Sequence, residues 1–146
     1  MTTDDQFAGV VKQRSQLGQA MQQVELAAAA PAAKGSWIPE LTQSLRQLDI
    51  AFDQHIRDVQ APLGLLDRIV DRAPRLQRSV EASKAEHAAV AEMVKQAVLL
   101  TEADDAADRV DEVREATMAA LVALARHRQK GADLIYDAYA IDIGGY

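Results

Sequence analysis

Three histidines are the residues of this chain whose types and positions best suit them for chemistry. His55, His87 and His127 each lie on the apolar stripe of a different predicted helix. His55 follows Phe52 by three residues, and His127 follows Leu124 by three, so each ring stands beside an apolar neighbour and points toward the core. Neutral imidazole is the commonest metal ligand, and the cores of helical bundles hold metal sites built from facing helices. The sequence therefore predicts a core metal site with these three rings as ligands.

Two carboxylates close to these histidines are the candidates to complete such a site. Asp58 lies one helical turn after His55, and Glu86 directly precedes His87, about 100° around the helix. A site with two neighbouring metal ions requires bridging anions, which carboxylates supply. The alternative for both side chains is a solvated position on the helix surface. The paired spacings His-x-x-x-His and Glu-x-x-His do not occur in the chain.

The rest of the sequence contains few signals for other chemistry. The chain has no cysteine, which excludes disulfides, thiolate metal sites and a cysteine nucleophile. It contains no glycine-rich phosphate loop, no Gly-x-Ser-x-Gly elbow and no His-Glu-x-x-His zinc motif. The acidic segment 101–105 lacks the residue pattern of a calcium loop. A metal held by imidazole is therefore the chemistry that the residues favour.

Charge and hydropathy limit the expected partners and location. The formal net charge of −6 disfavours binding to nucleic acid, which requires a basic surface. No apolar run approaches the roughly 20 residues that cross a bilayer, so we expect no membrane partner. The segment 1–5 is acidic and lacks the basic start of a signal peptide. Together with the lack of cysteine, these features indicate a cytoplasmic protein.

The elements that must position the histidines are predicted to be helices. Alanine, the best helix former, occurs 28 times, whereas aromatic residues, which are enriched in strands, make up 4% of the chain. Apolar residues recur at spacings of three and four, which is typical of amphipathic helices. These helices are expected at about 3–30, 37–71 with a kink or an end at Pro62 and Gly64, 75–100 and 110–139, before a tail at 140–146 without a clear period. The predicted fold is all-α: a single domain over 1–146, formed by a four-helix up-down bundle with kinked or additional helical segments.

Four stretches of the chain resemble hemerythrin-like proteins of actinobacteria, the HHE cation-binding group. They are FDQHIRDV at 52–59, GLLD at 64–67, AEH at 85–87 and RHRQKGADLIY at 126–136. The resemblance covers about 40–143 and leaves the first helix as an addition or a repositioned member of the bundle. It implies a four-helix bundle that holds a non-haem di-iron centre and binds, senses or reacts with dioxygen, peroxide or nitric oxide.

The ligand pattern of this chain is shorter than that of the family. Hemerythrins bind their irons with five histidines and two bridging carboxylates, whereas this chain has three histidines. The family's His-x-x-x-Glu would place a glutamate at Ala91, its His-x-x-x-His a histidine at Gly131, and its His-x-x-x-x-Asp an aspartate at Ala132. The resemblance therefore carries over only the three histidines, one from each helix. A reduced, a rearranged and a lost metal site all fit this pattern.

The alternative function is that of a metal-free helical bundle acting through protein–protein interaction. In that case the histidines are buried residues with separate hydrogen-bond partners, and the apolar stripes also allow packing against a second copy in a homodimer. The distance between the rings distinguishes the two hypotheses. Ligands of one metal ion, each about 2 Å from it, require ring nitrogens within roughly 5 Å of one another.

The segment after His127 contains further polar residues whose role the sequence leaves open. Gly131 lies one turn after His127 on the same face, where the missing side chain leaves room or lets a neighbouring helix approach. Tyr136 is expected on nearly the opposite side of a straight helix. Asp133 and Asp137 share a face and are expected to pair with nearby basic residues.

Overall fold

The chain folds entirely into helices and connecting turns over the residues that the structure describes. The computed structural model describes the backbone of residues 3–144 and the side chains of residues 16–140. Its elements are α1 (Thr3–Ala29), α2 (Trp37–Gln60), α3 (Leu65–Arg72), η1 (Pro74–Leu76), α4 (Gln77–Glu102), η2 (Ala106–Asp108) and α5 (Val110–Gly144). No strand occurs within this described range, so the all-α prediction is confirmed.

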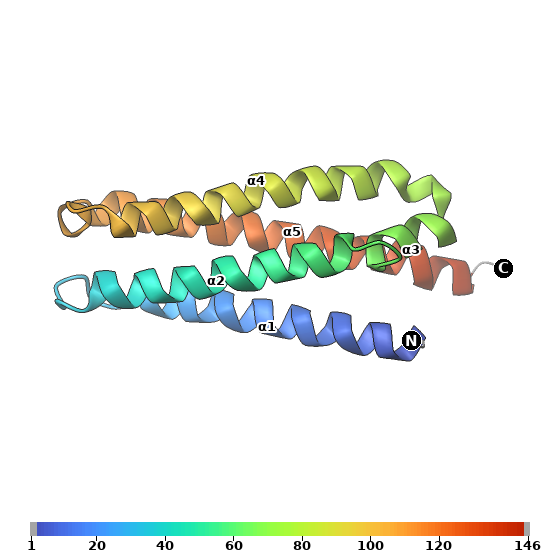
Figure 1. Cartoon of the computed structure of the whole chain (residues 1–146), viewed down its shortest axis with the longest axis horizontal. Helices are drawn as coiled ribbons and strands as arrows, with labels where there is room; N and C mark the ends of the chain where they lie inside the picture. Colours follow the sequence, from blue (N-terminus) through green and yellow to red (C-terminus); the bar gives the residue numbers. More distant parts are fainter. Residues whose placement is uncertain (1–2, 145–146) are drawn as a thin grey trace.

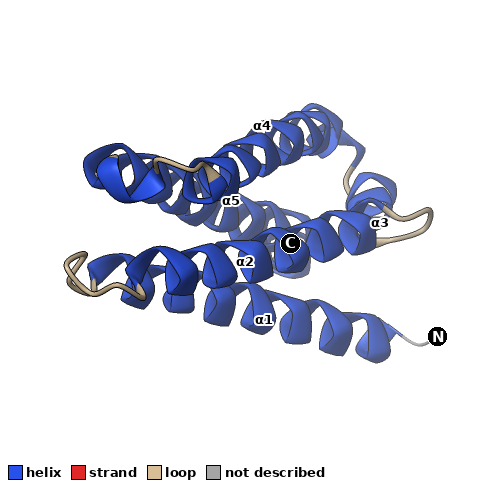
Figure 2. Cartoon of the chain, turned by 60° about the vertical axis from the view of Figure 1, so that its left-hand side comes forward, coloured by secondary structure: helices blue, strands red, loops and turns tan. Residues whose placement is uncertain are grey.

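The four long helices form an antiparallel bundle in which neighbours in the chain are neighbours in space. Helices α1, α2, α4 and α5 alternate in direction along the long axis (Figure 1). Contacts join α1 to α2, α2 to α4, α4 to α5, and α5 back to α1, which closes the ring of helices. Figure 2 shows the pair α1–α2 beneath the pair α4–α5. The predicted up-down topology is therefore confirmed.

None of the described helices combines the length and the apolar character that crossing a bilayer requires.

A tight turn separates α2 from the short helix α3, so the predicted break at residues 62–64 ends the helix. Leu63 adopts a positive φ of 61°, and its backbone N–H donates to the Asp67 carboxylate at 2.9 Å. Gly64 is required here, because a Cβ atom would lie 2.8 Å from the Ala61 carbonyl oxygen and 2.9 Å from that of Asp58. The turn directs α3 across the end of the bundle that carries the C-terminus of α5 (Figure 1).

Helix α5 continues further than the sequence predicted. We expected an irregular tail from Ala140, but the helix extends to Gly144. Two contacts with α3 lie just before this extension: Arg72 Nε donates to the Ala138 carbonyl oxygen at 3.0 Å, and its guanidinium lies 4.8 Å from the centre of the Tyr139 ring.

The buried apolar residues form two clusters at different heights in the bundle. The larger cluster fills the body between all four long helices and includes Leu17, Val24, Trp37, Leu41, Leu45, Phe52, Val90, Val94 and Leu124. The smaller cluster lies beneath α3 and includes Val59, Leu66, Ile69, Val80, Leu134 and Ala138. The first half of the predicted stripe on α1, Phe7 to Arg14, lies outside the described side chains.

The three histidines lie between these clusters. On α2, His55 separates Phe52 of the larger cluster from Val59 of the smaller one. His87 on α4 and His127 on α5 stand at the same transition, with Val90 and Leu124 on the side of the larger cluster. The alignment of α2, α4 and α5 along the bundle thus places the three rings in one layer.

The packing predicts a strong difference between two aliphatic positions of α2. Leu45 is 0% exposed within the larger cluster, whereas Ile50 is 67% exposed on the same helix. Leu45→Ala should lower the free energy of unfolding by about 2–5 kcal/mol, because it removes buried contacts and leaves a cavity. Ile50→Ala, the matched control, should change it by less than about 0.5 kcal/mol. Urea unfolding followed by circular dichroism measures both, and equal losses would contradict the observed packing.

Candidate metal centre

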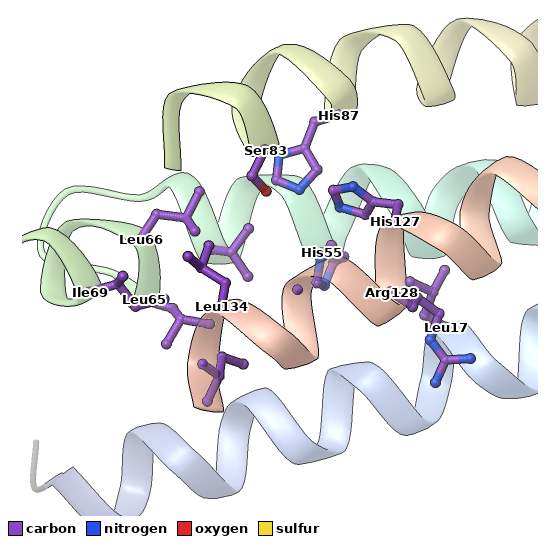
Figure 3. Close-up of a pocket in the computed structure, with 13 residues that line it drawn as sticks. Leu17, His55, Leu65, Leu66, Ile69, Ser83, His87, His127, Arg128 and Leu134 are labelled. Atoms are coloured by element: carbon purple, nitrogen blue, oxygen red, sulfur yellow. The ribbon is translucent and has the colours of Figure 1, made fainter. Parts of the chain in front are cut away.

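The three histidine side chains converge on one point in the core. Each ring offers one nitrogen to a set in which all the ligand atoms lie within 4.8 Å of one another. The ring centres are 4.5 Å apart for His87 and His127, 5.7 Å for His55 and His87, and 6.3 Å for His55 and His127. Figure 3 shows the rings approaching from α2, α4 and α5. The convergence meets the distance condition that the sequence analysis set for a shared metal ion.

Phe52 holds the three rings from the side of the larger apolar cluster. Its ring stacks on His55 with 6.0 Å between centres and an interplanar angle of 12°. It also meets His87 and His127 edge-on at 6.0 and 5.8 Å. The sequence identified Phe52 only as a stripe residue, because spacing along one helix carries no information about contacts to the other two. The structure adds it as the residue common to all three ligands.

A hydrogen bond fixes the tautomer of His87. Its Nδ1 lies 2.5 Å from the Oε1 atom of Gln60, the last residue of α2. An amide oxygen only accepts, so the imidazole proton is on Nδ1 and the lone pair is on Nε2. Metal-binding histidines commonly donate their second ring N–H to an oxygen in this way, which orients the ring. The sequence analysis did not predict this role for Gln60.

Glu86 orients His127 instead of joining the group of ligand atoms. Its Oε1 accepts a hydrogen bond from His127 Nδ1 at 2.8 Å, and its Oε2 accepts one from Lys130 Nζ at 2.8 Å. Burial alone would raise the pKa of Glu86, but the hydrogen bonds from Lys130 and His127 outweigh it and lower the pKa. The carboxylate therefore stays charged and accepts the Nδ1 proton of His127, which orients the ring. The sequence analysis named Glu86 as a candidate ligand, and the structure places its carboxylate on His127 and Lys130, outside the group of three histidine nitrogens.

Asp58 also lies outside the group of ligand atoms. Both of its carboxylate oxygens accept hydrogen bonds from Gln54 Nε2 at 3.1 Å, one helical turn earlier on α2. Within the described part of the chain, the only group of three or more potential ligands that could hold a metal consists of the three histidines. A pair of irons requires bridging carboxylates, so the described residues do not fit the di-iron centre of the family. They fit a single ion.

A small cavity opens beside the three rings. Its volume is about 40 Å³. One water-sized atom requires about 10–15 Å³ by this measure, so the cavity holds a ligand of about three atoms. Helix α3 closes one end with Leu65, Leu66 and Ile69, and the Ser83 hydroxyl faces the space next to His87 (Figure 3). The cavity is thus apolar apart from the imidazoles, Ser83 and Arg128.

Helix α1 covers the cavity from the remaining side, a role that the sequence analysis did not predict. Leu17 of α1 and Arg128 of α5 line the cavity together. In Figure 3 the guanidinium of Arg128 is turned toward α1. Gly18 leaves the space for it, since a Cβ atom there would lie 3.2 Å from Arg128 Nη2. Arg128 Nη1 also contacts the sulfur of Met21 at 3.7 Å.

The residues of α5 that follow His127 face different parts of the molecule: the cavity, the surface and an outer groove. Gly131 lines the cavity, and a Cβ atom added there would meet nothing within 4 Å, so of the two predicted roles it leaves room. Tyr136 is 64% exposed, as expected for the far side of a straight helix. Asp133 accepts a hydrogen bond from Gln129 at 3.0 Å, and Asp133 and Asp137 line an outer groove between α4 and α5.

Comparison with protein-family models, curated proteins and solved structures finds no match to this chain. The geometry of the three histidines and their surroundings is therefore the basis for a functional proposal.

The burial of His87 predicts that stability falls in acid. Burial, with the neighbouring charges of His127 and His55, lowers the pKa of His87 to about 3. The unfolded chain takes up this proton near pH 6.5. Between pH 6.5 and about 3 the unfolded state therefore binds more protons, and the free energy of unfolding decreases as pH falls, by up to about 1.4 kcal/mol per pH unit. Urea unfolding between pH 4 and 8, with a chelator present, measures this slope.

His87→Leu is the comparison that isolates this group. The variant lacks the proton that the unfolded wild type takes up, so its stability should depend less steeply on pH below 6.5. The amide of Gln60, which lies on an exposed residue, remains accessible to water after the substitution. Parallel pH profiles for the wild type and His87→Leu would contradict this prediction, because they would show that His87 has the same pKa in the folded and the unfolded state.

Proposed function

We propose that this chain is a hemerythrin-like helical bundle that holds one transition-metal ion on His55, His87 and His127. The observation that carries the proposal is the convergence of the three ring nitrogens within 4.8 Å in a core layer between two apolar clusters. Two nitrogens bound to one ion at about 2 Å lie at most about 4 Å apart, so small ring rotations complete the site.

The surroundings of the rings support the same function. His87 and His127 are both buried and both donate their Nδ1–H, to Gln60 and Glu86 respectively, so each presents a lone pair on Nε2. Three neutral imidazoles suit iron, copper, zinc or nickel, and the resemblance to hemerythrin-like proteins favours iron. Iron, when bound, supplies redox chemistry toward dioxygen, peroxide or nitric oxide, and the cavity of about 40 Å³ suits ligands of this size.

The protein residues around the ion have distinct tasks in this proposal. The histidines bind the metal, Phe52 holds the rings in place, and Glu86 keeps His127 in the required tautomer. The apolar side chains of α3 exclude bulk water from the cavity. Three protein ligands leave positions on the ion for a small molecule, as in catalytic metal sites with an open position.

Metal content and thermal melts test this proposal. The wild type should take up about one ion per chain after exposure to iron(II) without oxygen, and the ion should raise the melting temperature because it binds only the folded state. His127→Leu should lose both effects. Thr117→Val, a control at a buried polar residue of the same helix whose hydroxyl donates to the Val113 carbonyl oxygen, should keep the metal. Fewer than about 0.2 ions per chain in the wild type, with no effect of chelator on its melting, would contradict the proposal.

The role of Glu86 gives a second prediction for the same site. Glu86→Gln removes the carboxylate that fixes His127, and metal affinity should fall about tenfold to a hundredfold, as for other partners of metal-bound histidines. Glu81→Gln, five residues earlier on α4 and paired with Lys84 at the surface, should bind the metal as the wild type does. Competition with a chromogenic chelator measures both affinities, and equal values would show that Glu86 does not act through His127.

A further inference from the structure

The walls of the cavity differ in how well they suit the passage of a cation. Helix α3 closes one end with the apolar side chains of Leu65, Leu66 and Ile69. Toward α1 the lining includes Leu17 and the positive guanidinium of Arg128 (Figure 3). An apolar wall offers a cation no ligand in place of its water, and a positive side chain repels it. A metal ion that reaches the three histidines is therefore expected to enter from another side.

An acidic groove between α4 and α5 adjoins the cavity. Its volume is about 370 Å³, and the charged side chains in its lining are three carboxylates, Glu86, Asp133 and Asp137, and one ammonium group, Lys130. Lys130 Nζ lies 2.8 Å from Glu86 Oε2, so these two charges offset each other. Arg75 approaches Asp137 and donates to its backbone carbonyl oxygen at 3.0 Å. The two aspartates thus leave the groove negative, with Asp133 the more distinct charge.

His127 connects this groove to the candidate metal ligands. Ser83, His127 and Leu134 line both the groove and the inner cavity, so they form the wall between the two spaces. His127 is 3% exposed, and its Nδ1 is engaged by Glu86, which leaves its other ring nitrogen for a metal ion. A cation in the groove is thus separated from one of its three ligands by a single layer of side chains.

The carboxylates of the groove act on a cation through their charge and not as ligands. Glu86 is held by His127 and Lys130, and Asp133 accepts a hydrogen bond from Gln129 at 3.0 Å. A divalent cation about 10 Å from one carboxylate in water is favoured about fourfold at low ionic strength. Clefts lined by charges of one sign raise the association rate of an oppositely charged ligand by about tenfold or more, and salt suppresses this effect.

We infer that a divalent metal cation reaches the three histidines through the groove between α4 and α5, drawn by the negative charge of Asp133 and Asp137 and admitted past Ser83 and His127. The inference rests on the proposed metal site and adds the route by which that site is loaded. Asp133 and Asp137 steer the ion in this route, since they lie outside the group of ligand atoms. They should control the rate of uptake, whereas the histidines control the affinity.

Stopped-flow uptake of cobalt(II) tests this route, because the visible absorption of cobalt(II) reports its binding to ligands. At low ionic strength Asp133→Asn should slow uptake about threefold, and the further change Asp137→Asn should bring the loss to about tenfold. Ser79→Lys adds a positive charge at an exposed residue of the groove and should also slow uptake. Asp104→Asn, the matched control in the exposed connection between α4 and η2, should leave the rate unchanged.

Release and salt dependence separate a loading route from a general loss of stability. A residue that acts on the route changes uptake and release alike, so release of cobalt(II) to a chelator should slow by the same factor while the affinity stays close to that of the wild type. In about 1 M salt, where the Debye length is about 3 Å, the rates of Asp133→Asn and the wild type should become equal. Equal rates at low salt, or a difference that persists at high salt, would overturn the inference.

The uptake of cobalt(II) by the wild type is measured first. Its absence contradicts the proposed metal site and the route with it. Uptake at a rate that does not depend on Asp133 contradicts the route alone.

Discussion

Three imidazole rings share one layer of the core, and burial there keeps the ring of His87 neutral. Protonation of His87 is opposed by burial and by its two neighbours, which is why its pKa lies near 3. Neutral rings still require partners for their N–H groups, since an unpaired polar group in a core is costly. Gln60 and Glu86 supply these partners from the edge of the layer. The packing of α2, α4 and α5 therefore depends on the position of the three rings relative to Gln60 and Glu86.

The layer divides the molecule into parts with different roles. On one side, Phe52 and the larger apolar cluster fix the rings against the body of the bundle. On the other side, the side chains of α3 leave a small apolar cavity. The hydrogen-bond partners of the rings lie toward the outside, where Glu86 also meets Lys130. This separation of a rigid support, an apolar space and a polar rim is what a site for a metal and a small ligand requires.

The number of donors in the layer determines which metal site the fold can hold. Three imidazoles converge, whereas Asp58 and Glu86 are engaged by Gln54 and by His127 with Lys130. One ion can share three nitrogens, but two adjacent ions require anions between them. The described residues thus bring together three imidazole nitrogens from three helices, which are fewer donors than a di-iron site requires.

Sequence periodicity alone was enough to predict the helices, their antiparallel order and the inward direction of the three histidines, because spacings of three and four specify a face of each helix. It could not establish that the rings meet at one height, since that depends on how four helices are aligned along their axes. Contacts between residues distant in the chain also decided that Glu86 supports His127 and that Leu17 of α1 closes the cavity. Local spacing specifies a direction for a side chain, but only the packing of separate helices determines what it meets there.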